Sequence, residues 1–342
     1  MMSMGKEWKK AAVLGGGSFG TSLAELVARR GHEVMLWVRR TEQAEAINST
    51  RRNPQYLSDF ELNPLLKATA SLDDALKDAD WVIVAVPSQA LRSVLELCAT
   101  AIAGKPIVLA AKGIERGSLM TMEEVAIDVL GEEHRPRLMA LSGPSFAREI
   151  MLGYPTAVVV ACIHEALAKK VSDYLFCDTF RAYTTTDIVG VEIGGALKNV
   201  MAIAAGGVIG MKLGSNVRAT LMTRGLSEMT RIAIAKGGNP LTLSGLSGVG
   251  DLTLTCTGGL SRNRMVGQLM GEGKTLAEAL DEIGQVAEGV ATAKSAFELA
   301  KKLDVEVPII DTIHQVLHLE VPAQDAFLSL VRRPTGTELD YR

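Results

Sequence analysis

The stretch AAVLGGGSFGTSLAELVARRGHEVMLWVRR, residues 11–40, decides the fold. Its apolar run 11–14 predicts a strand buried on both faces, and the run 33–37 predicts a second strand of the same kind. Between them, residues 21–30 carry apolar side chains at helical spacing. Strand, glycine turn, helix and strand in this order predict a βαβ unit, the building block of a doubly wound sheet.

The glycine turn of this stretch has the pattern G-x-G-x-x-G, formed by Gly15, Gly17 and Gly20. In this pattern the first glycine permits a tight turn, the second lets a pyrophosphate approach the backbone, and the third lets the helix pack closely on the strand. Free amide groups at the start of the helix attract the phosphates. The turn therefore predicts a dinucleotide site, and a packing turn without a ligand is the alternative.

The second predicted strand ends beside two arginines, Arg39 and Arg40. A site for NAD usually has an acidic residue here, about 20 positions past the glycines, which holds the ribose 2′-hydroxyl. Guanidinium groups suit a 2′-phosphate instead, because they form paired charge-assisted hydrogen bonds with it. We expect NADP(H) to be accepted as well as NAD(H), and the alternative is that the arginines only face solvent.

The alternation of strands and helices continues through the first half of the chain and then stops. Short apolar runs at 81–86, 107–111, 138–142, 157–161 and 181–183 predict further strands. After residue 187 the patterns are helical, at 188–208, 218–236, 276–283, 290–303 and 309–319. We expect a Rossmann-type, doubly wound, mostly parallel α/β domain that binds a dinucleotide over 1–187. An all-helical substrate and catalytic domain should follow over 188–342.

Composition excludes several classes of protein. The chain has 342 residues, is 47% hydrophobic and has a net charge of −3, which gives no reason to expect a nucleic acid partner. The apolar stretch 189–213 contains charged residues, Glu192 and Lys198 among them, and this favours a buried helix over a membrane span. The first ten residues lack the apolar run of a secretory signal.

Metal-binding and disulfide patterns are also missing from the sequence. The four cysteines show no C-x-x-C spacing, which fits a reducing cytoplasm. His314 and His318 are four apart, but no third ligand accompanies them, so we expect no metal site.

Polar residues follow the predicted strands at the edge where ligands of open α/β sheets bind. Lys112 comes directly after one strand, and Gly143, Ser145 and Ala147 follow the next. Plain alternatives exist, since Lys112 suits a solvated loop and Ser145 suits the cap of a helix.

Two segments of the helical half carry polar groups among apolar neighbours. Lys198 and Asn199 lie inside the segment VEIGGALKNVMAIAAGG, where burial would lower the pKa of a lysine and suit it to proton transfer. Asp251 and the run SRNR, residues 261–264, follow two glycine turns. A lysine at the rim of the fold, and surface turns followed by a helix cap, are the alternatives. Otherwise Arg262 and Asn263 suit an anion such as a phosphate.

Together these motifs resemble one family, the bacterial biosynthetic NAD(P)-dependent sn-glycerol-3-phosphate dehydrogenases. The resemblance extends from about residue 13 to about residue 319, and no motif in the tail after Pro322 matches. The matching segments are GGGSFGTSLA, VPSQALR, AAKGIE, SGPSFA, GVEIGGALKNVMAIAAG, GLSGVGDLTLTCT, SRNR and GQVAEGV.

The resemblance implies a function and assigns residues to it. The activity would be hydride transfer from NAD(P)H to C2 of dihydroxyacetone phosphate, giving sn-glycerol 3-phosphate for phospholipid synthesis in a cytoplasmic homodimer. Lys198 would donate and accept the proton, with Asp251 beside it and Lys112 in electrostatic support. Substrate contacts would be Lys112, Gly143, Ser145, Lys198, Asn199, Asp251, Ser261, Arg262 and Asn263. Besides the glycines, cofactor contacts would be Ser18, Phe19, Arg39, Lys112, Ala147, Arg262, Val286 and Glu288, to which the charge argument adds Arg40.

Two other functions stay open at this point. An enzyme of the same architecture that reduces a hydroxy acid precursor would not need the SRNR run to hold a phosphate. A module that binds NAD(P) without chemistry would keep the glycines but would not need Lys198 and Asp251.

Overall fold

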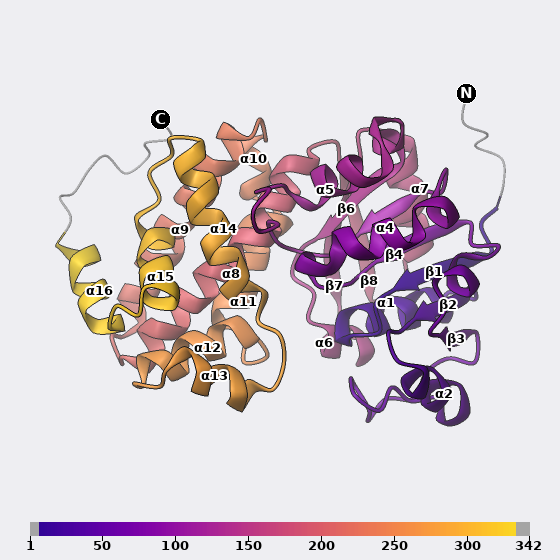
Figure 1. Cartoon of the computed structure of the whole chain (residues 1–342), viewed down its shortest axis with the longest axis horizontal. Coiled ribbons are helices and arrows are strands. Elements are labelled where there is room, and N and C mark those ends of the chain that lie inside the picture. The colour runs from indigo at the N-terminus through magenta and orange to yellow at the C-terminus, as the bar shows by residue number, and fades with distance from the viewer. Residues whose placement is uncertain (1–6, 333–342) are drawn as a thin grey trace. The chain divides into compact units, whose positions relative to one another are not determined.

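The computed structural model of the chain describes residues 7–332, which form two compact units (Figure 1). The sheet unit contains residues 7–111, 123–141 and 145–186. Among the described residues, the helical unit contains 187–332, and it also takes in 112–122 and 142–144 from the first half of the chain. Residues 333–342, the end of the predicted helical domain, lie outside the described range. Residues 1–6, on which part of the secretory-signal prediction rests, lie outside the described range.

The sheet unit is built on eight strands in the order β3-β2-β1-β4-β5-β6-β7-β8. The pairs from β3 to β6 are parallel, and so is the pair of β7 with β8. This confirms the predicted doubly wound, mostly parallel sheet. The strands are β1 Lys10–Leu14, β2 Glu33–Trp37, β3 Leu66–Thr69, β4 Trp81–Val84, β5 Ile107–Leu109, β6 Leu138–Ser142, β7 Thr156–Ala161 and β8 Phe180–Thr185.

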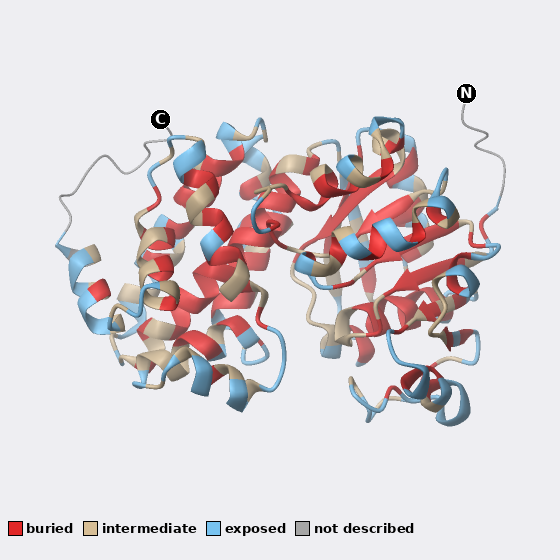
Figure 2. Cartoon of the chain, in the orientation of Figure 1, coloured by how far each residue is buried: buried red, intermediate tan, exposed pale blue. Residues whose placement is uncertain are grey.

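The sequence does not predict strand β3 because it lies at an edge of the sheet. Its residues LKAT alternate between buried and exposed, so the continuous apolar run that marks the inner strands is missing. Inner strands such as β4 are buried at every position, which Figure 2 shows as red ribbon through the middle of the sheet.

Helices connect the strands and complete the core of the sheet unit. They are α1 Ser18–Arg29, α2 Thr41–Thr50, α3 Leu72–Leu76, α4 Leu91–Ile102, α5 Met122–Leu130, α6 Ala147–Met151 and α7 Glu165–Leu175. Helix α1 follows the glycine turn and buries nine consecutive residues from Gly20 to Ala28. This helix therefore fixes the position of the turn against the sheet.

The helical unit is organised around one long buried helix, α8 Ile188–Gly210 (Figures 1 and 2). By length and composition α8 could cross a membrane, but 89% of its apolar window is buried inside the protein, as expected for a core helix. Around it are α9 Ser215–Ala235, α10 Pro240–Leu243, α11 Asp251–Thr257, α12 Arg262–Gly271, α13 Leu276–Ile283, α14 Glu288–Lys302, α15 Pro308–His318 and α16 Ala323–Val331. Of these, α10, α11, α12 and α16 are absent from the sequence prediction. Helices α10 and α11 are short, α12 is rich in glycine and polar residues, and α16 lies in the tail after Pro322, where the sequence matches no motif.

Candidate functional site

The three glycines of the turn differ in what surrounds them. Gly15 has a φ of +117°, and a Cβ on it would lie 2.7 Å from the carbonyl oxygen of Ala85, the residue that follows the neighbouring strand β4. A Cβ on Gly20 would overlap the carbonyl of Gly15. A Cβ on Gly17 would meet nothing within 4 Å. Gly15 and Gly20 are therefore required by packing, whereas Gly17 lies beside open space that a phosphate can occupy.

Helix α1 begins at Ser18 with Gly17 as its N-cap, and this N-cap residue makes no side-chain capping hydrogen bond. The first turn also contains no acidic residue. The amide groups of this turn therefore suit an anion, as the sequence predicts. The aromatic ring of Phe19 packs against the hydrophobic core of the sheet unit.

Two buried amide side chains, which the sequence analysis does not identify, hold the glycine turn in place. Asn53, with no exposed surface, donates to the carbonyl of Gly16 at 2.9 Å and to the hydroxyl of Thr21 at 2.9 Å. Gln43 donates to the same carbonyl at 3.1 Å. Asn53 precedes a proline in a polar loop, a context that by itself indicates only a turn.

Of the remaining candidates of the sheet unit, the two arginines are exposed, and Ser145 and Ala147 are half-buried. Arg39 and Arg40 are exposed, and within residues 7–332 no ion pair of either guanidinium is observed. Arg40 is the N-cap of α2, and Ala147 is the first residue of α6. Phe146, not Ser145, is the N-cap of α6, so the alternative of Ser145 as a helix cap is wrong.

The helical unit contains a buried group of two lysines around one carboxylate. Nζ of Lys198 donates to Oδ1 of Asp251, and Nζ of Lys112 donates to Oδ2 of the same side chain at 2.8 Å. Asp251 has no exposed surface and Lys198 is only 8% exposed, so Lys198 does not lie at the rim of the fold. Lys112 also donates to the carbonyl of Gly143 at 3.3 Å, so it is not a solvated loop lysine.

Two glycines that precede Lys198 allow this group to form. A Cβ on Gly194 would overlap the carbonyl of Ser247, which lies in the helical turn Leu246–Gly250 directly before Asp251. A Cβ on Gly195 would lie 2.6 Å from Oγ of Ser142 and 3.5 Å from the side chain of Lys112. The pair GG in α8 therefore lets two separate segments approach the helix, and these segments deliver the carboxylate and the second lysine.

The second hydrogen-bond partner of Lys198 is Thr255, which the sequence does not predict. Lys198 donates to Oγ1 of Thr255 at 3.0 Å, and that hydroxyl donates to the carbonyl of Asp251 at 2.6 Å. Thr255 lies one turn after Asp251 on α11. Its hydroxyl therefore gives the ammonium group a fixed acceptor besides the Asp251 carboxylate. The i, i+4 spacing from Asp251 is the sequence signal for this residue.

Burial and neighbouring charges together determine the pKa values of Lys198 and Asp251. Burial lowers the pKa of Lys198 to about 8, and the nearby ammonium of Lys112 adds to this effect while Asp251 opposes it. Burial alone would raise the pKa of Asp251, but the two ammonium groups and their hydrogen bonds lower it below its usual value. At neutral pH the three side chains therefore hold a buried net positive charge, which attracts an anionic ligand.

The SRN segment begins α12 and is engaged within the helical unit. Ser261 is the N-cap, with its Oγ accepting from the amide of Arg264 at 3.3 Å, so the helix-cap alternative is correct for this residue. Arg262 is exposed and donates to Oε1 of Gln285 at 3.3 Å. Asn263 is buried, and its Nδ2 donates to Oδ1 of Asn199 at 2.9 Å.

The last two cofactor candidates lie close in sequence to Gln285, the hydrogen-bond partner of Arg262. Val286 is 60% exposed, a large value for an apolar side chain, and Glu288 is the first residue of α14. Because Arg262 contacts Gln285, the start of α12 and the segment before α14 are neighbours.

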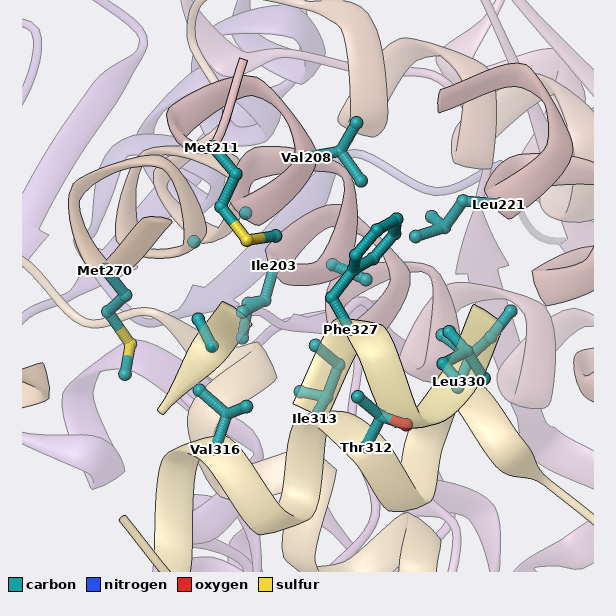
Figure 3. Close-up of a pocket in the computed structure, with 15 residues that line it drawn as sticks. Ile203, Val208, Met211, Leu221, Met270, Thr312, Ile313, Val316, Phe327 and Leu330 are labelled. Carbon is teal, nitrogen blue, oxygen red and sulfur yellow. The ribbon is translucent and has the colours of Figure 1, made fainter. Parts of the chain in front are cut away.

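A separate apolar cavity lies on the far part of α8, away from Lys198 (Figure 3). It is lined by side chains from α8, α9, α12, α15 and α16, and Phe327 points into it. Its one polar side chain, Thr312, already donates its hydroxyl to the carbonyl of Pro308 at 2.8 Å. The cavity therefore offers no acid, base or charge for a reaction.

Comparison with known proteins agrees with this geometry over nearly the whole chain. Residues 10–168 match the N-terminal domain of NAD-dependent glycerol-3-phosphate dehydrogenase, and residues 187–328 match the C-terminal domain. The chain belongs to this dehydrogenase family. A glycerol-3-phosphate dehydrogenase [NAD(P)+] of Anaeromyxobacter dehalogenans is 51% identical over 96% of this chain and 100% of its own length. The enzyme of that name in Geobacter sulfurreducens is 48% identical over 96% and 99%.

A solved structure gives the same result for the fold of this glycerol-3-phosphate dehydrogenase family. The crystal structure of glycerol-3-phosphate dehydrogenase from Coxiella burnetii has a TM-score of 0.91 and 37% identity, over 95% of this chain and 99% of that one. Family membership places the buried Lys198–Asp251–Lys112 group in an NAD(P)-dependent oxidoreductase that acts on a CH–OH group.

Proposed function

We propose that this chain reduces dihydroxyacetone phosphate to sn-glycerol 3-phosphate with NADPH or NADH, and that Lys198 donates the proton. The observation that carries the proposal is the buried Lys198–Asp251–Lys112 group in a chain of this family. A module that only binds a dinucleotide has no use for two lysines buried around one carboxylate, because burying charge costs stability.

The residues present fit the dinucleotide. Gly17 leaves open space at the start of α1, where uncapped amide groups suit a pyrophosphate. Arg39 and Arg40 at the end of β2 suit the 2′-phosphate of NADP(H). When bound, the reduced cofactor supplies the hydride that reaches C2 of the ketone.

Lys198 supplies the proton that the reduced ketone needs. Its ammonium stabilises the negative charge that develops on the C2 oxygen and then transfers a proton to that oxygen. A lysine whose pKa is about 8 loses this proton far more readily than an ordinary lysine. In the reverse direction the neutral amine accepts the proton of the C2 hydroxyl.

The other side chains of the group prepare Lys198 for this step. Asp251 keeps the ammonium charged despite burial, and Thr255 fixes its direction. Lys112 adds a second positive charge on the opposite carboxylate oxygen, which favours an anionic substrate. Arg262, the exposed first residue of α12, would hold the substrate phosphate, and this binding energy would position the carbonyl.

The test is to follow the absorbance of NADPH and NADH while dihydroxyacetone phosphate or unphosphorylated dihydroxyacetone is added to the purified protein. The phosphorylated ketone should be reduced and the free ketone should react far more slowly, because only the former engages Arg262. The variant Lys198→Ala should lower kcat by roughly 10²–10⁴-fold, the usual size of an acid–base contribution. A near-normal rate in this variant would remove Lys198 from the role.

Two other outcomes would favour the alternative functions. Preferential reduction of a carboxylated ketone would favour an enzyme that acts on hydroxy acids. Cofactor binding without reduction of any ketone would favour a binding module. The further proposals of a homodimer, a cytoplasmic location and a role in phospholipid synthesis rest on the family resemblance, and light scattering of the purified protein tests the first of them.

A further inference from the structure

The glycine turn consists of three consecutive glycines, residues 15–17, and the middle one is buried. Because glycine has no Cβ, the peptide group between two neighbouring glycines can rotate at little steric cost. The N–H of Gly17 belongs to such a peptide group, and Gly17 is the helix N-cap that lies beside open space. The residues of the turn therefore do not fix the direction of this N–H by themselves.

Two side-chain amides fix this peptide group from its carbonyl end. The carbonyl oxygen of Gly16 accepts from Nδ2 of Asn53 at 2.9 Å and from Nε2 of Gln43 at 3.1 Å. The peptide bond is trans, so its carbonyl and its N–H point in opposite directions. Holding the carbonyl of Gly16 toward these two buried amides therefore turns the N–H of Gly17 away from them.

The amide of Asn53 is itself held at both ends. Its Oδ1 accepts from Nε2 of Gln43 at 3.0 Å and from the backbone N–H of Gln55 at 3.3 Å. A backbone N–H can only donate, so the atom that faces it is the amide oxygen, and the NH₂ group must face Gly16. The same NH₂ group also donates to the hydroxyl of Thr21 on α1 at 2.9 Å. These bonds, in a side chain with no exposed surface, allow Asn53 a single orientation.

Packing keeps the carbonyl of Gly16 within reach of both amides. A Cβ on Gly16 would lie 2.2 Å from Cγ1 of Val38, the residue after β2, and 3.4 Å from Nε2 of Gln43. Residue 16 is a position that the pattern G-x-G-x-x-G leaves variable, yet a Cβ does not fit here without a shift of Val38. The turn therefore lies directly against the end of β2 and the first turn of α2, which carries Gln43.

We propose that Asn53 is a positioning residue for the dinucleotide, which directs the N–H of Gly17 toward the pyrophosphate, with Gln43 in support. Asn53 acts on the cofactor through the peptide group between Gly16 and Gly17. A peptide group that is already held in the binding orientation does not have to be ordered when the ligand arrives. The bond that its N–H makes to a phosphate oxygen is charge-assisted and therefore strong. This inference rests on the proposed cofactor site at the start of α1.

Isothermal titration calorimetry of the purified protein with NADPH and with NADH tests the proposal. Asn53→Ala releases the carbonyl of Gly16 and should raise Kd for both cofactors about 10-fold or more, the size expected for one hydrogen bond to a charged group. Asn53→Asp has nearly the same shape but turns a second oxygen toward that carbonyl, so it should raise Kd at least as much. Values of Kd within about 2-fold of wild type in both variants would overturn the proposal.

A third variant keeps the test decisive if replacement of Asn53 prevents folding. Gln43→Ala removes the other donor to Gly16 and should raise Kd for both cofactors by about 3-fold or more. An unchanged Kd in Gln43→Ala, together with an unfolded Asn53→Ala, would show that the amides serve folding alone and would overturn the proposal.

Thr21→Val is the matched control, because it removes the other acceptor of Asn53 and leaves the bond to Gly16 in place. Thr21→Val and Asn53→Ala both break a buried hydrogen bond, so both should lower the temperature of thermal unfolding. Only Asn53→Ala should weaken cofactor binding. Equal weakening in Thr21→Val would assign the effect to a loosened fold and would refute the positioning role.

Kinetics separate this inference from the proposed function. With saturating cofactor, Asn53→Ala should keep kcat and KM for dihydroxyacetone phosphate within about 2-fold of wild type, because the change acts on cofactor affinity. A lower kcat with an unchanged Kd would count against the proposal. If the wild type binds NADPH or NADH but reduces no ketone, the proposed function fails, and the Kd values still decide this inference. If the wild type binds neither cofactor, the inference fails with the cofactor site.

Discussion

Replacement of Asp251 by asparagine should change the pH dependence of the reaction more than any other single change in the helical unit. Asp251 is fully buried between two ammonium groups, and its charge is what keeps the pKa of Lys198 as high as about 8. The asparagine side chain has nearly the same shape but no charge. Burial and Lys112 would then act on Lys198 unopposed, and both lower its pKa.

The size of the effect follows from the geometry of the group. Loss of a charged neighbour at hydrogen-bond distance changes a pKa by about 1–3 units, so we take about 2 units and expect a pKa near 6. Reduction of the ketone needs Lys198 protonated, and at about pH 7.5 the protonated fraction would fall about 25-fold. The alkaline limb of the kcat/KM profile should therefore move to lower pH by about 2 units.

The assay is kcat/KM for dihydroxyacetone phosphate with saturating cofactor, measured from about pH 5.5 to about pH 9.5. Asp304→Asn, at an exposed position of the same unit, is the matched control and should leave the profile unchanged. An alkaline limb that stays in place, with kcat/KM at about pH 7.5 within about 2-fold of wild type, would refute the assignment of that limb to Lys198.

Four further substitutions test other parts of the structure. Arg39→Ala should raise KM for NADPH by about 10-fold or more, because a charge-assisted hydrogen bond to the 2′-phosphate is lost. KM for NADH should stay nearly unchanged, and equal changes for both cofactors would contradict this prediction. Gly206→Ala should lower the free energy of unfolding by about 1–3 kcal/mol because its Cβ overlaps the carbonyl of Arg264. Gly207→Ala should raise the free energy of unfolding by up to about 1 kcal/mol, because its Cβ would lie 3.8 Å from the nearest atom on α12 and alanine favours the helix. Denaturant titration of the two glycine variants should therefore give changes of opposite sign, and changes of the same sign would contradict this packing of α8 on α12. Burial raises the pKa of Glu228 to about 7, so its contribution to stability is full below about pH 4.5 and is lost as the pH rises through 7. Glu228→Gln should reduce this pH dependence in thermal unfolding, and an unchanged dependence would exclude Glu228 as its source.

The inner strands of the sheet, and a residue such as Lys198 whose neighbours in the sequence differ from it in polarity, could be predicted from the sequence. Buried inner strands show as unbroken apolar runs, and a lysine inside an apolar helix is conspicuous, so the α/β half and Lys198 could be recognised directly. Edge strand β3 lacks such a run, since half of its side chains face solvent. Helices α11 and α12 carry functional candidates in short segments where glycines and polar residues hide the helical period.

Contacts between distant segments could not be predicted in the same way. Nothing near Lys112 in the sequence indicates that it meets Asp251, which is 139 positions away. Asn53 reaches the glycine turn across 37 positions, and its neighbours indicate only a loop. These placements depend on tertiary packing, and no local pattern records them.

Glycines at contact points explain how the helical unit can place so many polar groups along one buried helix. A helix buried on all sides must exclude polar neighbours unless another backbone approaches closely enough to pair with them. Along α8, Gly194, Gly195 and Gly206 each lie where a Cβ would clash with another segment. The first two bring Asp251 and Lys112 to Lys198, and the third holds α12 where Asn263 meets Asn199. The glycines of α8 therefore make room for the partners of Lys198 and Asn199.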